Sequence, residues 1–366
     1  MEIGIVGLPK SGKTTVFNAL TKGRAETGVY APATAGPNIG VAKVPDPRLE
    51  VLDPIFHPKR KIPAEVTYVD VAAPPKSPGK SEGITGQFPT HMSKADAVLH
   101  VVRAFEDAKI PHIAGCIDPE RDAATMDLEL AFSDLASIER RLERIETSLK
   151  AAKPHEREVF SREQILLGRI KTALETDTPI RQQQLTEDEE RLISDFQFLT
   201  AKPFLLVFNI GEERLAEASS LEEKWRAKCQ RPQLQSAVLC GKLEMELSQL
   251  EDADARLFRS SMELEEAALN RMVTLSYELL GLISFFTVVS NEVKAWTIHH
   301  DTPAVKAAGK IHSDMERGFI RAEVISYDDM VSCGSIAEAR KRGLLHVEGK
   351  NYTVHDGDII TFLFSI

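Results

Sequence analysis

The sequence predicts an α/β protein whose mostly parallel sheet is interrupted by a helical hairpin and followed by a smaller α+β domain. Runs typical of buried strands recur at residues 2–6, 97–103 and 203–209. Residues 119–200 are charged and helical in pattern, and short alternating strands prevail from about residue 282. We therefore expect one sheet domain from residues 1–118 and 201–281, an insertion at 119–200 and a second domain at 282–366.

Length and composition narrow the class of protein. The 366 residues suffice for two or three domains, and a hydrophobic content of 43% supports a substantial core. The net charge of −10 argues against broad adhesion to nucleic acid, and we expect no DNA partner. Four scattered cysteines without a C-x-x-C pair indicate reduced thiols. A strand at the very start leaves no room for a signal peptide, and no apolar run reaches about 18 residues. We expect a cytoplasmic protein without a membrane partner.

A phosphate-binding loop is the strongest motif in the chain. The run Gly7-Leu8-Pro9-Lys10-Ser11-Gly12-Lys13-Thr14 fits G-x-x-x-x-G-K-[ST] between a predicted strand and a predicted helix. Main-chain N–H groups of such a turn converge on phosphate oxygens, while Lys13 adds positive charge and the Thr14 hydroxyl can ligate Mg²⁺. The alternative is a chance match, which the strand before and the helix after disfavour. The motif predicts a bound nucleoside triphosphate.

Two further residues are candidates for the magnesium site. Thr34 lies in a loop rich in glycine and proline, where switch proteins sense the γ-phosphate, although it could be an ordinary loop threonine. Asp70 ends the predicted strand 65–71, which is the position of a Walker B carboxylate that holds Mg²⁺ through water. The usual sequel D-x-x-G is absent, because Ala73 and Pro74 come next.

The expected base site comes after the strand at 203–209. Asn209-Ile210-Gly211-Glu212 stands where switch GTPases have N-K-x-D, at the edge of the sheet where ligands bind. Glu212 carries its carboxylate one methylene further out than Asp, and Ile210 replaces the lysine whose stem covers the base. Both changes weaken the recognition of guanine. Cys240 opens the loop before Lys242 and is expected to be a small buried residue beside the base.

The insertion shows the pattern of two antiparallel helices. Leu135, Ile138, Leu142, Ile145 and Leu149 recur at alternating spacings of 3 and 4, which is a heptad seam. Residues 151–154 interrupt it, and a second helix is expected to face back through four residues: Val159, Leu166, Ile170 and Leu174. Its outer charges form either a solvated face or a docking arm for a partner.

Taken together, the chain resembles the YchF/Obg-like ATPase family of P-loop proteins over nearly its whole length. The resemblance rests on residues 7–13, 36–40, 44–49, 100–107, 209–212 and 242–247, and on a C-terminal segment similar to a TGS domain with residues 308–309 and 316–329.

This resemblance implies a P-loop NTPase G-domain with an inserted antiparallel helical hairpin and a C-terminal β-grasp TGS domain. It also implies ATP preferred over GTP, dependence on Mg²⁺, and association with the ribosome or ribosomal RNA. By position, Mg²⁺ would meet Thr14 and Thr34. The adenine would meet Asn209, Ile210 and Glu212. The ATP phosphates would meet Pro9, Lys10, Ser11, Gly12, Lys13, Thr14 and Thr15.

The chain departs from the family pattern where the chemistry is most sensitive. The family usually has Asn-Val in place of Lys10-Ser11 and a glycine in place of Ala73. Ala73 followed by proline restricts the switch, so hydrolysis is expected to be slow. A family Asn can help to hold K⁺ beside the phosphates. The Lys10 ammonium could take that place and act in catalysis with Lys13, or it could be a solvated lysine.

Several functions are compatible with these residues. The leading hypothesis is a slowly hydrolysing ATPase switch that reports its state to the ribosome. A nucleotide-gated binding module without useful hydrolysis is the alternative that Ala73 and Pro74 favour. A GTP-binding protein is disfavoured by Ile210 and Glu212, and no acceptor site indicates a kinase. For the TGS domain, nucleic-acid binding, protein contact and plain packing all remain open.

Overall fold

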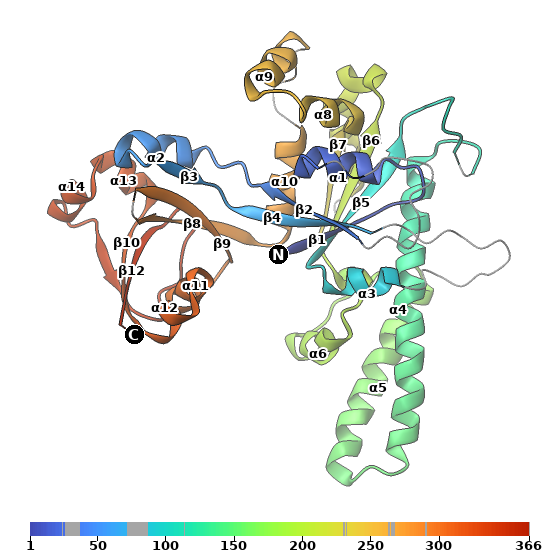
Figure 1. The fold of residues 1–366 in the computed structure, drawn as a ribbon. Coiled ribbons are helices and arrows are strands. Elements are labelled where there is room, and N and C mark those ends of the chain that lie inside the picture. Colours follow the sequence, from blue (N-terminus) through green and yellow to red (C-terminus); the bar gives the residue numbers. More distant parts are fainter. Residues whose placement is uncertain are drawn as a thin grey trace. The chain divides into compact units, whose positions relative to one another are not determined.

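The computed structural model describes residues 1–23, 25, 37–71, 87–112, 114–229, 231, 233–262, 264, 268–289 and 291–365. The chain forms two compact units, Met1–Val41 with Thr67–Met272 and Ala42–Val66 with Val273–Ile366 (Figure 1). Within the described residues, no helix combines the length and the apolar character needed to cross a membrane.

The first unit is built on a six-stranded sheet in the order β2-β4-β1-β5-β6-β7. The pairs β1–β4, β1–β5, β5–β6 and β6–β7 are parallel, which confirms the mostly parallel sheet predicted from the sequence. The strands are β1 (Glu2–Val6), β2 (Asn38–Lys43), β4 (Glu65–Asp70), β5 (Ala97–Ala104), β6 (Phe204–Ile210) and β7 (Leu234–Leu239).

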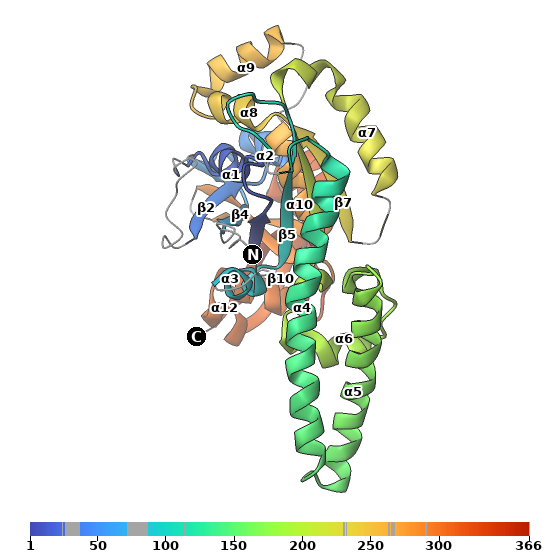
Figure 2. The same ribbon diagram turned by 90° about the vertical axis from the view of Figure 1, so that its right-hand side faces the viewer.

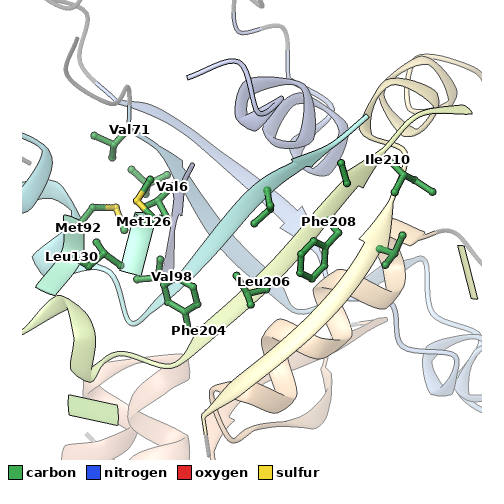
Figure 3. Close-up of a cluster of buried hydrophobic side chains, with 14 of the residues drawn as sticks. Val6, Val71, Met92, Val98, Met126, Leu130, Phe204, Leu206, Phe208 and Ile210 are labelled. Atoms are coloured by element: carbon green, nitrogen blue, oxygen red, sulfur yellow. The ribbon is translucent and has the colours of Figure 1, made fainter. Parts of the chain in front are cut away.

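The centre of this sheet is buried along its whole length. Every residue of β5 and β6 is buried, as expected for parallel strands with helices on both faces. Phe204 and Phe208 of β6 lie in one core cluster with Met126 and Leu130 of α4 (Pro119–Leu149), as Figure 3 shows. Further helices of this unit include α1 (Lys13–Thr21), α3 (Gln87–Lys94), η4 (Glu212–Glu217), α7 (Ala218–Lys228), α8 (Gly241–Leu247) and α9 (Asp252–Ser261), and α10 (Ala268–Leu279) begins in this unit and ends in the second.

The insertion forms the predicted antiparallel helical hairpin. We call α4 and α5 (Pro154–Glu175) the helical arm; α4 begins against the sheet, and its second half runs beside α5 and extends away from the sheet (Figures 1 and 2). Ile138 and Ile145 are fully buried in a cluster with residues of α5, which confirms the seam. The helical spacing predicts that Val159 faces this seam, but 47% of it is exposed. After the arm, the chain folds into η1 (Ile180–Gln182), α6 (Glu187–Ile193), η2 (Ser194–Phe196) and η3 (Leu199–Ala201).

The second unit contains another six-stranded sheet, in the order β11-β10-β12-β8-β9-β3. Small residues on one face of α11 (Ala304–Ile311) pack against aromatic residues such as Phe285 and Phe319. The strands are β3 (Arg60–Ile62), β8 (Leu282–Val289), β9 (Glu292–His299), β10 (Phe319–Ile325), β11 (His346–Glu348) and β12 (Ile359–Phe364). The other helices are α2 (Arg48–Phe56), α12 (Ser313–Arg317), α13 (Tyr327–Cys333) and α14 (Ile336–Lys341).

Residues 42–66 belong by their contacts to this second unit, although their position in the sequence groups them with the nucleotide-binding residues. The strand β3 pairs in parallel with β9, and the Arg48 guanidinium bonds both carboxylate oxygens of Asp356 while it lies over the Phe286 ring. The domain boundaries expected from the sequence, after residues 118, 200 and 281, stay a proposal.

Candidate functional site

The phosphate loop joins β1 to α1 as a tight turn with glycine at the two positions where a side chain would clash. Gly12 has φ 91°, and a Cβ atom there would lie 2.3 Å from the Asn209 amide nitrogen. A Cβ atom on Gly7 would lie 2.6 Å from the Val101 carbonyl oxygen. Lys10 has φ 68°, in the left-handed region that is costly for a residue with a side chain. The loop thus lies close against β5 and β6, with α1 beginning directly after it.

The two predicted metal ligands of α1 and β4 lie together in the structure. The Thr14 hydroxyl donates a hydrogen bond of 2.9 Å to Asp70 Oδ2, and Lys13 Nζ lies 3.9 Å from Oδ1. Asp70 is buried, and its Oδ1 has no hydrogen-bond partner among the described atoms. A hydroxyl beside a carboxylate oxygen with free lone pairs is the hard oxygen donor set that Mg²⁺ prefers, so these residues fit the ion.

The Asn209 side chain, at the end of β6, connects the phosphate loop to the start of α8. Its Nδ2 donates to the Ser11 carbonyl over 3.0 Å, and its Oδ1 accepts from the Gly241 N–H over 2.9 Å. The side chain therefore joins β6, the loop and the first turn of α8 in one buried contact. One N–H and one lone pair of the amide remain for a ligand.

Ile210 and Cys240 are both buried, each 3% exposed, in the core cluster of the sheet. The Ile210 side chain lies at one end of that cluster in Figure 3 and offers a base almost no surface. Burial raises the pKa of the Cys240 thiol, which keeps it in the unreactive protonated form.

Glu212 is exposed and takes part in an ion pair across the expected base site. Lys242 Nζ donates to Glu212 Oε1 over 2.8 Å, which connects η4 to α8. The pKa of Lys242 is raised by this hydrogen bond. The carboxylate that would meet a purine is thus partly engaged by a cation in this structure.

The remaining predicted residues differ in their surroundings. Ser11 is buried and its hydroxyl has no hydrogen-bond partner among the described atoms, while its N–H donates to the Leu8 carbonyl over 3.2 Å. Lys10 Nζ lies 3.5 Å from the Pro111 carbonyl, while Pro9 is exposed and Thr15 is half-buried. Thr34, Ala73 and Pro74 lie outside the described residues.

Three groups near the loop were not singled out from the sequence as site residues. Asn38 Nδ2 lies 3.5 Å from Asp70 Oδ2, and its only signal was its place in the motif at 36–40. Arg103 is buried at the end of β5, with Nη2 bonded to the Ile110 carbonyl over 2.8 Å. His112 and Asp122 form a buried pair behind the loop, and no spacing in the sequence predicts that pairing.

Comparison with known protein families yields two matches. Residues 2–124 match the model described as "50S ribosome-binding GTPase". Residues 282–365 match the model YchF-GTPase_C, described as a protein of unknown function (DUF933).

Similar proteins cover the whole chain. It is 39% identical over 369 residues to "Ribosome-binding ATPase YchF" of Bacillus subtilis (strain 168), with all of both chains covered. It is 37% identical over 365 residues to the protein of the same name from Escherichia coli O157:H7, covering all of this chain and 99% of that one. The structure of the Schizosaccharomyces pombe YchF GTPase is similar with a TM-score of 0.85 and 30% identity, over 99% of this chain and 97% of the other. A GTP binding protein from Pyrococcus horikoshii OT3 shares the fold at a TM-score of 0.59 and 17% identity, over all of both chains.

Proposed function

Because the chain belongs to the YchF family of P-loop proteins, we propose that it is a ribosome-associated, Mg²⁺-dependent ATPase that hydrolyses ATP slowly. The observation that carries this proposal is the contact between Thr14 of the phosphate loop and the buried carboxylate of Asp70. It brings the two motif residues of a P-loop NTPase into one place. The names of the similar proteins support the ATPase activity and the ribosome as partner.

The phosphate chain of ATP would lie against residues 9–15 and be held by the N–H groups of residues 10–15, since Pro9 has none, with Lys13 supplying a positive charge. Thr14 and Asp70 would hold Mg²⁺, and Thr34 is proposed as a further ligand. When bound, Mg²⁺ would offset the negative charge that builds up on the phosphate oxygens. Asn38 and Lys13 would then orient the Asp70 carboxylate, to which both side chains are close.

The purine would lie between β6 and the start of α8, near Asn209, the main chain of residue 210, Glu212 and Cys240. ATP is preferred in this proposal because guanine is held by a carboxylate that accepts from N1–H and from the exocyclic amine. Here the carboxylate of Glu212 is displaced by one methylene and is paired with Lys242. Adenine has no N1–H to donate, so it loses nothing by this arrangement.

Slow hydrolysis is expected from the residues that would surround the γ-phosphate. The family lacks the glutamine that orients the attacking water in Ras-like proteins. Ala73 stands before Pro74 where the family has a flexible glycine. Lys10 is proposed to supply the charge that a bound K⁺ ion supplies in relatives with asparagine at this position.

The rest of the chain would communicate the nucleotide state to the ribosome in the cytoplasm. Along the sequence, the insertion at 119–200 and the TGS domain at 282–366 border the nucleotide-binding residues at 1–118 and 201–281. Each is a proposed contact with ribosomal protein or RNA. For the TGS domain the candidate contacts with RNA are four exposed cations, Arg317, Arg321, Lys341 and Arg342, three of which pair with neighbouring carboxylates.

A nucleotide-gated binding module without useful hydrolysis is the second candidate, favoured by Ala73 and Pro74. Single-turnover hydrolysis of ATP, measured with and without 70S ribosomes, separates the two. The ATPase predicts measurable ADP formation that ribosomes accelerate. The binding module predicts ribosome binding that depends on ATP while the ATP stays intact. Tight GTP binding with no ATP binding in a calorimeter would contradict both.

A further inference from the structure

A small cavity lies directly behind the phosphate loop. Its walls come from the loop, from β5 and from the residues after β5, and they include Pro9, Ser11, His100, Arg103, His112 and Asp122. The cavity is therefore shared by the element that would grip the phosphates and by the chain that leads into the helical arm.

Polar atoms around this cavity lack hydrogen-bond partners. Eight buried side-chain atoms of this kind occur among the described residues, and four line this cavity: Ser11 Oγ, both ring nitrogens of His100, and Arg103 Nη1. Buried polar groups in folded proteins are nearly always paired. Four such atoms at one place leave the cluster with free donors and acceptors that could bond to new partners if the loop moved.

The chain after β5 is tied to the loop side of the cavity. We call residues 105–112 and 114–118 the β5–α4 connection. Arg103 Nε donates to the Phe105 carbonyl over 3.2 Å and Nη2 donates to the Ile110 carbonyl over 2.8 Å. Lys10 Nζ of the phosphate loop lies 3.5 Å from the carbonyl of the next residue, Pro111. A movement of the phosphate loop would therefore displace the β5–α4 connection.

The same connection is clamped to the first turn of the helical arm. His112 Nε2 lies 2.8 Å from Asp122 Oδ2, and the two side chains are only 7% and 4% exposed. Arg121 donates to Asp122 Oδ1 and to the Cys116 carbonyl, which closes the connection back on α4. Separating such a buried pair is costly, because each side chain would be left without its partner. A displacement of His112 would therefore move Asp122 and the first turn of α4 with it.

The helix α4 begins at the His112–Asp122 pair and continues without a break from the sheet into the arm. Met126 and Leu130 of α4 pack in the core of the sheet, whereas Ile138 and Ile145 pack in the core of the arm. The 31 residues of α4 span about 46 Å at 1.5 Å per residue. A rotation of about 5° at its first turn would displace its far end by about 4 Å over such a length.

From these contacts we infer that the β5–α4 connection links the phosphate loop to the helical arm, so that nucleotide occupancy sets the orientation of the arm. Asp122 is the positioning residue of this link, because it joins the connection to α4. This inference rests on the proposed nucleotide site and adds which part of the chain, the helical arm, responds to nucleotide binding there. A triphosphate draws the loop amides toward itself, the unpaired groups at the cavity find new partners, and α4 turns at its first turn.

The test measures the arm directly in the full-length chain. Spin labels are placed at the exposed positions Glu146 on the arm and Glu223 on α7, after Cys116, Cys229 and Cys333 are replaced by serine. Double electron–electron resonance then gives the label distance without nucleotide and with Mg²⁺ and a non-hydrolysable ATP analogue. We expect a shift of about 4 Å on analogue binding. We expect Asp122→Asn to bind the analogue while more than half of the shift is lost.

Two further variants make the result specific. Glu163→Gln breaks the Arg141–Glu163 pair, which is equally well hydrogen-bonded but lies further along the arm, and should keep the full shift. His112→Asn removes the clamp from the connection side and should lose the shift as Asp122→Asn does. Thermal melts confirm that each variant is folded.

The outcomes separate the inference from the proposed function. Analogue binding without any shift in the parent protein overturns the link and leaves the ATPase proposal standing. A full shift in a folded Asp122→Asn variant also overturns it. Absence of analogue binding, confirmed with a fluorescent ATP analogue in the same samples, would refute the proposed nucleotide site itself.

Discussion

Thr14 and Asp70 are 56 residues apart in the sequence, yet the Thr14 hydroxyl donates a 2.9 Å hydrogen bond to the Asp70 carboxylate. The bond joins the first turn of α1 to the last residue of β4. Because the parallel strands β1 and β4 are neighbours, their carboxyl ends lie side by side, and the loop after β1 begins beside the end of β4. The phosphate loop and the Walker B position therefore meet at one edge of the sheet.

We predict that Asp70→Asn removes the effect of Mg²⁺ on ATP binding. Losing a charged partner costs about 1.5–3 kcal/mol, so ATP affinity in Mg²⁺ should fall about tenfold or more. Affinity in EDTA should change far less. Isothermal titration calorimetry in both buffers measures this, with Asp53→Asn as the surface control. An unchanged affinity of Asp70→Asn in Mg²⁺ would remove Asp70 from the metal site.

A second prediction concerns the amide that fixes the phosphate loop. Asn209→Ala leaves the Ser11 carbonyl and the Gly241 N–H without their partner in a buried place, at a cost of about 1–3 kcal/mol. Asn209→Asp can still accept from Gly241 but places a carboxylate against the Ser11 carbonyl, so it should not restore stability. Urea unfolding of the parent and both variants gives the answer. Equal stability of Asn209→Asp and the parent would contradict this role.

The parts of the fold that the sequence predicts well are those where burial leaves a local pattern. The strands β5 and β6 are mostly apolar because both of their faces are covered, and the Ile138 and Ile145 seam has helical spacing. β3 carries no such pattern. It has three residues, two of them charged, and it joins a sheet whose next strand lies more than 200 residues away.

For the candidate site, motifs predict which residues gather but not what each side chain contacts. Thr14 and Asp70 are predictable because strand order and loop position place them together. Lys242 pairs with Glu212 through two flexible side chains, and Asn38 approaches Asp70 across neighbouring strands. Neither contact leaves a spacing in the sequence. Val159 fits the helical period and is nevertheless exposed, because the next residue, Phe160, packs against the core of the arm in its place.

Purine selectivity gives a third prediction, at Glu212. In Glu212→Asp the shorter side chain draws the carboxylate back by one methylene and stretches its ion pair with Lys242. We expect GTP to gain on ATP by about tenfold, which corresponds to about 1.4 kcal/mol. Competition of ATP and GTP against a fluorescent analogue measures the ratio. Glu217→Asp, in the same short helix, serves as the control, and an unchanged ratio in Glu212→Asp would remove residue 212 from base recognition.

The buried histidine of β5 gives a prediction for pH. Burial lowers the pKa of His100 from 6.5 to about 3, and the nearby Arg181 charge acts in the same direction while Asp122 opposes it. At pH values between these two pKa values, the His100 side chain is protonated in the unfolded chain but not in the folded chain. The free energy of unfolding therefore falls as the pH drops below 6.5, by about 1.4 kcal/mol per pH unit.

His100→Phe removes both unpaired ring nitrogens and the proton. Its stability relative to the parent should rise by about 1.4 kcal/mol per pH unit between about pH 6 and pH 4. Urea unfolding at several pH values measures the difference. Val101→Ala, a buried change on the same strand without a titratable group, provides the control, since its stability difference from the parent should not vary with pH. A constant difference between His100→Phe and the parent would mean that His100 titrates normally in the folded protein.

The last prediction concerns Lys10, whose backbone lies in the left-handed region at φ 68°. Asparagine tolerates this conformation better than lysine does, so a lysine here implies a gain elsewhere. If its ammonium takes the place of K⁺ beside the phosphates, turnover of ATP should be equal in KCl and NaCl. Lys10→Asn should then turn over more slowly in NaCl and recover in KCl, because an ion replaces the lost charge. Lys109→Asn, on the neighbouring connection, should respond to neither salt. Strong K⁺ stimulation of the parent protein would show that Lys10 is a solvated side chain and that its amino group takes no part in turnover.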